Sequence, residues 1–79
     1  MDFKTKYLLA KKNGLIDRFR GDEISRRISR EYPLSAQISI ALDREDDKEK
    51  WNRYQAFRAN VKKEVDQLIA EVEQEYGES

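Results

Sequence analysis

The acidic segment 43–47 contains the residues of this sequence that are best suited to binding a metal ion. Carboxylate oxygens are preferred calcium ligands, and calcium-binding EF-hand loops are rich in them. The pattern fails at the sixth position, where Lys48 replaces the required glycine, and at the twelfth, where Tyr54 replaces the bidentate glutamate. We therefore interpret the segment as a solvated break before a helix and expect no metal site.

A second group of residues with chemical potential is basic and lies in the first half of the chain. Its members are Arg18, Arg20, Arg26, Arg27 and Arg30. A basic face near a proline-containing turn between two helices makes a small nucleic-acid-binding regulator the alternative prediction. However, the helix that would enter the groove, 36–42, has no Arg, Lys or Asn to contact base edges. Acidic residues also interleave with the arginines, so we favour a solvated surface or pairing within the chain and do not expect a nucleic-acid partner.

The sequence lacks two side chains that are common in active sites, because its 79 residues include no His and no Cys. The usual proton shuttle and thiolate nucleophile are therefore missing. We predict a protein that is not an enzyme and uses no cofactor. The aromatic group Trp51, Tyr54 and Phe57 is interpreted as core in preference to a binding platform. No apolar run is long enough for a membrane span or a signal peptide, so the expected location is the cytoplasm.

Helices are the elements expected to carry these residues, because Gly and Pro are sparse and apolar residues recur at helical spacing. The predicted helices cover residues 2–13, 22–31, 36–42 and 47–76. The resulting fold is all-α, with three short helices packed on one long C-terminal helix. It forms a single domain over 1–79, with the short helices in 1–45, the long helix in 46–76 and a frayed tail at 77–79.

The boundaries of these helices follow from capping residues. Asn13-Gly14 fits a left-handed C-terminal cap, and the rival interpretation is a hairpin turn. Asp22, Ser35 and Asp46 are predicted N-caps of the three later helices. The predicted core comprises Phe3, Tyr7, Leu8, Leu15, Ile16, Phe19, Ile24, Ile28, Tyr32, Leu34, Ile38, Leu42, Trp51, Tyr54 and Val61.

The long helix is expected to extend beyond the short ones, since about 30 residues at about 1.5 Å each span roughly 45 Å. Its distal apolar residues should then need a partner. The residues expected to mediate self-association are Val65, Leu68, Ile69 and Val72. We therefore predict a non-enzymatic structural or adaptor module for protein–protein interaction that self-associates through its C-terminal helix.

The charge pattern of the chain indicates how copies would be oriented. Residues 1–30 carry nine basic and four acidic side chains, whereas residues 31–79 carry seven and twelve. Within the last helix, 48–63 is basic and 64–79 is acidic. A parallel dimer would place acid on acid, so we expect a homo-oligomer with antiparallel C-terminal helices, or an acidic tail docked on a neighbour's basic N-terminal segment.

Several short motifs in the middle of the chain resemble those of short prophage-encoded proteins of unassigned function. They are Ile28-x3-Tyr32-x-Leu34-x2-Gln37-Ile38, Asp43-Arg44-Glu45, Trp51-x2-Tyr54 and Val61-Lys62. The similarity covers about residues 24–70. It departs from the pattern at Pro33, where Ser is expected, and at Val61, where Cys often precedes Lys. The resemblance implies a phage-related context and carries no mechanism with it.

Overall fold

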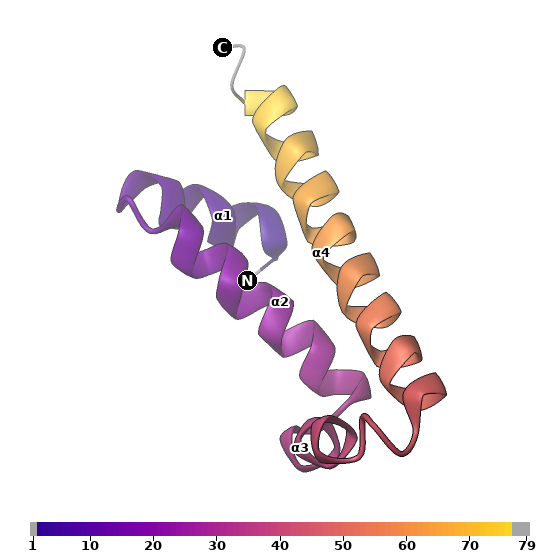
Figure 1. Ribbon diagram of the computed structural model, residues 1–79. Coiled ribbons are helices and arrows are strands. Elements are labelled where there is room, and N and C mark those ends of the chain that lie inside the picture. The colour runs from indigo at the N-terminus through magenta and orange to yellow at the C-terminus, as the bar shows by residue number, and fades with distance from the viewer. Residues whose placement is uncertain (1, 77–79) are drawn as a thin grey trace.

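Four helices make up the part of the chain that the structure, a computed structural model, describes, which is residues 2–76. They are α1 (Phe3–Lys12), α2 (Ile16–Glu31), α3 (Leu34–Leu42) and α4 (Lys48–Tyr76). Figure 1 shows α2 running beside the long helix α4, α1 folded back beside the first half of α2, and α3 at the opposite end from the α1–α2 turn. The rod measures 52 × 19 × 18 Å. The predicted all-α fold with one long C-terminal helix is confirmed; the predicted frayed tail at 77–79 lies outside the described residues.

Helix α1 ends as Asn13-Gly14 predicts, and it begins after Asp2, which was predicted to be its first residue and is its N-cap. The side chain of Asp2 accepts a hydrogen bond from the Thr5 backbone N–H at 2.8 Å. Gly14 follows the helix with φ +70°, the left-handed conformation that favours glycine. The rival hairpin interpretation is wrong, since no strand occurs among residues 2–76.

Helix α2 is longer than predicted, because the segment expected to be a connector is its first turn. Asp22 was predicted to be an N-cap, and instead it lies inside a helix that runs without a break through Gly21. A glycine inside a helix costs about 1 kcal/mol relative to alanine. Packing offsets this cost: the Phe19 ring lies 5.2 Å from that of Phe3 and 5.8 Å from that of Tyr7.

The later helix starts also differ from prediction by one or two residues. Helix α3 begins at Leu34, directly after Pro33, so Ser35 is not its cap. Pro33 itself occupies the N-cap position, and no side-chain hydrogen bond caps this helix. Before α4, Asp47 in place of Asp46 accepts a hydrogen bond from the backbone N–H of Lys50 at 3.1 Å.

The core lies between α2 and α4 and is closed at one end by α3. Its buried residues are Ile24, Ile28, Ile40, Tyr54, Val61 and Val65, with Tyr32, Trp51, Phe57 and Ile69 packed against them. The Tyr54 hydroxyl donates to Oε1 of Gln37 at 2.8 Å, and Nε2 of Gln37 donates to the Tyr32 carbonyl at 2.7 Å. These bonds tie α3 to the other two helices. None of the helices within residues 2–76 combines the length and apolarity needed to span a bilayer.

Candidate protein-interaction surface

The distal apolar strip of α4 is covered by the chain itself. Val65 has no exposed surface, Val72 is buried, and Leu68 and Ile69 are half-buried. The prediction that these four residues lie beyond the reach of the short helices is therefore wrong. The reason is that α2 is continuous and turns α1 back toward the C-terminal half of α4 (Figure 1).

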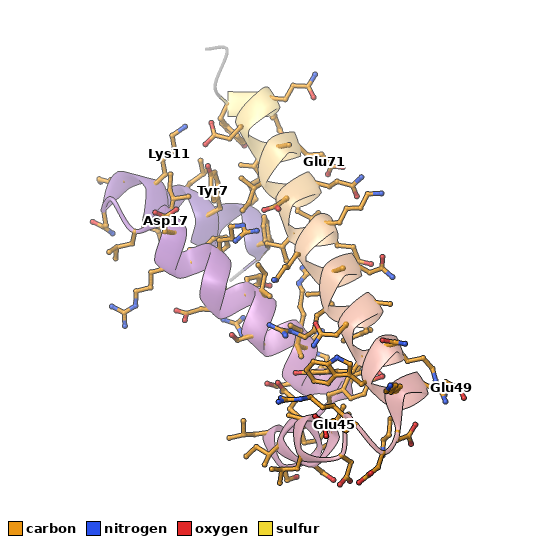
Figure 2. The ribbon with its side chains drawn as sticks, viewed as in Figure 1. Tyr7, Lys11, Asp17, Glu45, Glu49 and Glu71 are labelled. Carbon is orange, nitrogen blue, oxygen red and sulfur yellow. The ribbon has the colours of Figure 1, made fainter. Side chains whose placement is uncertain are left out.

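Polar contacts attach α1 to the end of α4. The Tyr7 hydroxyl donates a hydrogen bond to the Glu73 carboxylate, which also pairs with Nζ of Lys11 at 2.8 Å. Nζ of Lys4 lies 2.9 Å from Oε1 of Glu75. Figure 2 shows Tyr7 and Lys11 on α1, whereas Glu71 projects from the other side of α4. Side chains of both helices thus hold α1 against the C-terminal half of α4.

These contacts change the proton affinities of the groups involved. Burial, followed by the hydrogen bond to Glu73, raises the pKa of Tyr7 to about 12. The hydrogen bonds from Lys11 and then Tyr7 lower the pKa of Glu73. The protonated tyrosine and the ionised glutamate are therefore the forms that the folded chain stabilises.

Three carboxylates at the acidic end of α4, those of Asp66, Glu73 and Glu75, pair with basic residues of the same chain. Besides the contacts to α1, the carboxylate of Asp66 accepts two hydrogen bonds from Arg20, from Nε at 2.6 Å and from Nη2 at 3.1 Å. The guanidinium group lowers the pKa of Asp66. The predicted attraction between an acidic tail and the basic N-terminal segment thus occurs inside one copy. These pairs leave fewer acidic side chains for contacts between copies, which reduces the charge argument for antiparallel α4 helices; that arrangement stays a prediction.

The apolar surface that stays open lies on α3. Leu34, Ile38 and Leu42 are 69%, 52% and 78% exposed. They are spaced four residues apart and therefore share one face of the helix. All three were predicted to be core, and for all three the prediction is wrong. We call these residues the α3 strip.

The α3 strip is exposed because the opposite side of the same helix packs on the core. Ile40 is buried, and it lies two residues from Ile38, which places it roughly 200° around the helix. Helix α3 has no charged residue between Leu34 and Leu42, so it is apolar on both sides. A helix that is apolar all round is normally buried. From composition alone both sides of α3 would therefore be assigned to the core, so the sequence carries no signal that marks the exposed side.

Three of the five arginines predicted to form a basic surface pair with carboxylates of the same chain. Arg20 binds Asp66, and Arg26 and Arg27 lie 3.5 and 3.3 Å from the carboxylate of Glu23. Glu23 is buried, and its Oε2 atom has no hydrogen-bond partner. Arg18 and Arg30 are exposed. The predicted pairing of arginines within the chain is therefore present at three positions.

A surface pocket of about 340 Å³ lies between α2 and α4. Arg27 and Arg30 line it together with Glu31, Glu64 and Asn60. Two guanidinium groups and two carboxylates give this pocket no net charge, so charge alone would select neither anions nor cations. Within residues 2–76, no group of three or more acidic side chains is arranged to hold a metal ion.

Comparison with known proteins identified no relative of this chain. No protein-family model matches the chain, and no significant match was found among curated proteins or solved structures.

Proposed function

We propose that this chain is a non-enzymatic adaptor for protein–protein interaction and that the α3 strip is its docking surface. The observation that carries the proposal is the exposure of Leu34, Ile38 and Leu42 on one uncharged helix face. Helix-in-groove and helix-on-helix recognition both use apolar residues at this spacing. The cytoplasmic location and the phage-related context that the sequence suggests are part of the same proposal.

The surroundings of the α3 strip favour a basic partner. The segment that contains the α3 strip, residues 31–47, has five acidic side chains and one basic side chain, Arg44. Arg58 of α4 lies beside Leu34, where both line a surface pocket, so the acidic excess is concentrated at the Leu42 end of the strip. The acidic side chains are Glu31, Asp43, Glu45, Asp46 and Asp47. An amphipathic helix that presents leucines and lysines would match both the apolar strip and its acidic border.

Two earlier predictions receive less support from the geometry. Direct association through Val65 and Val72 would first require the helices packed on α4 to separate from it, because both residues are buried within the chain. Nucleic-acid binding through the arginine-rich face stays the alternative. It is weakened because Arg20, Arg26 and Arg27 already pair with carboxylates.

The proposal is tested with two synthetic amphipathic helical peptides, one of leucine and lysine and one of leucine and glutamate. We expect the basic peptide to shift the NMR signals of α3 and the acidic peptide to bind much more weakly. The double variant Ile38→Ser/Leu42→Ser should lose this binding, whereas the control Ser35→Ala/Ser39→Ala on the same exposed side should keep it. Equal binding by the double variant, or shifts confined to other helices, would contradict the proposal.

A further inference from the structure

We propose that a second copy of this chain is a partner of the α3 strip, and that it docks through the turn between α1 and α2, head to tail. This inference rests on the proposed function. Exposed leucines occur at both ends of the rod: the α3 strip lies at one end, and Leu9 and Leu15, 44% and 45% exposed, flank the turn at the other. Figure 1 shows the α1–α2 turn and α3 far apart at opposite ends.

The charge at the turn is opposite to that around the α3 strip. Lys6 and Lys12 are three residues before and after Leu9, so they lie on the same side of α1 as this leucine. Arg18 follows Leu15 by three residues in the first turn of α2. Asp17 is the acidic residue of this region, so segment 6–18 is basic.

The acidic end of α4 does not cancel this basic surface. Tyr7 and Lys11, four residues apart, lie on the side of α1 that contacts Glu73. Lys4 pairs with Glu75. These contacts use a different side of α1 from the one that Leu9, Lys6 and Lys12 share, so the tail acids and the exposed leucine belong to separate faces.

Charge complementarity therefore favours contact between unlike ends. Two α3 strips facing each other would bring two acidic borders together, and two turns facing each other would bring lysines together. When the α3 strip of one copy contacts the α1–α2 turn of another, leucines pack on apolar residues. The acidic side chains beside the strip then face the lysines beside the turn. Such a heterologous contact uses each end once, so it propagates into an open row or closes into a ring and does not stop at two copies.

The contact involves few large apolar side chains from each copy, so it is much smaller than a standard stable interface. We therefore expect weak association that depends on concentration and falls with added salt, because salt screens the exposed charges. Measurements should span about 10 µM to about 1 mM, the range in which such small contacts become populated.

The test is sedimentation equilibrium of two variants, each with one end blocked by a like charge. Leu42→Lys blocks the α3 end, and Leu9→Glu blocks the turn. The average mass of the wild type should grow with concentration past that of a dimer. Each variant alone should associate at least about tenfold more weakly. An equimolar mixture of the neutral variants Ile38→Ser and Leu15→Ser should form a dimer and stop there, since one intact end of each kind is available and the two altered ends carry no opposite charges.

Matched controls add the same charges elsewhere: Asn52→Lys and Gln67→Glu change exposed positions of α4 and should associate like the wild type. If a charged variant loses helicity, Ile38→Ser and Leu15→Ser replace the pair. A wild type that levels at a dimer, with Leu9→Glu still dimeric, would establish α3-on-α3 pairing and overturn the inference. A wild type that stays monomeric at all concentrations would also overturn it, while the peptide titration decides separately whether α3 is a docking surface.

Discussion

Two apolar strips, each with its residues at helical spacing, differ in exposure in this molecule. On α4, Val61, Val65 and Val72 are buried, whereas on α3 the residues Leu34, Ile38 and Leu42 are exposed. Periodicity identifies an apolar face in both cases. What covers that face depends on where the other helices travel, and periodicity does not contain this information.

The course of α2 decides the difference. Because α2 extends unbroken from Ile16 to Glu31, it spans much of α4 and delivers α1 to the distal half of the long helix. Helix α3 is left at the other end, where it closes the core with Ile40 and has no further helix beyond it (Figure 1). One helix thus has its apolar strip covered, and another presents its strip to solvent.

The largest expected effect comes from placing the same charge in each strip. Val65→Asp buries a carboxylate where no surface is exposed and should destabilise the fold by more than about 3 kcal/mol. Leu42→Asp changes an exposed position and should alter the free energy of unfolding by less than about 0.5 kcal/mol. Urea unfolding followed by circular dichroism measures both. Similar losses in the two variants would contradict the contrast between the strips.

A smaller effect is expected where α1 is attached to α4. Tyr7→Phe removes the hydroxyl that donates to Glu73 and should cost about 0.5–1.5 kcal/mol. Amide hydrogen exchange should accelerate in α1 more than in α3. Unchanged exchange in α1 would show that this hydrogen bond does not hold the cover in place.

The same hydroxyl predicts a dependence on alkaline pH. Because the pKa of Tyr7 is raised to about 12 from its ordinary value of 10.0, the folded chain keeps this proton where the unfolded chain has lost it. Its contribution to stability is complete below pH 10 and is lost as the pH rises toward 12. In Tyr7→Phe the decline of stability across this window should be shallower. Identical profiles would show that another group dominates.

The continuity of α2 is tested by its internal glycine. A Cβ atom added at Gly21 would meet nothing within 4 Å, so Gly21→Ala should stabilise the protein by about 0.5–1 kcal/mol. Gly14→Ala is the contrasting control, because φ of +70° disfavours alanine and the variant should be less stable than the wild type. Thermal unfolding distinguishes the two; a destabilised Gly21→Ala would argue for a break in α2.

The smallest effect is expected at the exposed ion pairs. The pKa values of Glu73 and Asp66 are lowered, so their contribution is present above their ordinary values of 4.5 and 3.8. It is lost as the pH falls through the lowered values. The variant Glu73→Gln should therefore show a shallower loss of stability between pH 5 and pH 2 than the wild type. An unchanged loss would assign the acid sensitivity to other carboxylates.

Local features of the chain predicted the helices well. Pro33 ends α2, Gly14 follows α1, and an aspartate precedes α4, all of which depend on neighbours in sequence. Gly21-Asp22 was misinterpreted as a helix start because the ring contacts of Phe19 with Phe3 and Tyr7 are tertiary and outweigh local propensity.

The candidate surface was the hardest part to predict. Leu34, Ile38 and Leu42 have the composition of a core, and only the placement of α3 at the end of the rod reveals that nothing covers them. Val65 was predicted to need a partner and is buried instead. This error has the same origin, because the length of α2 determines where α1 lies relative to α4. Both errors concern which helices meet, which local patterns do not specify.

The most direct test of this contrast is the relaxation that a soluble gadolinium complex causes in the methyl signals of the wild type at low concentration. We predict strong relaxation for the methyl groups of Leu34, Ile38 and Leu42, and weak relaxation for those of Val61, Val65 and Val72. Equal relaxation in the two strips, or stronger relaxation on α4, would contradict the account.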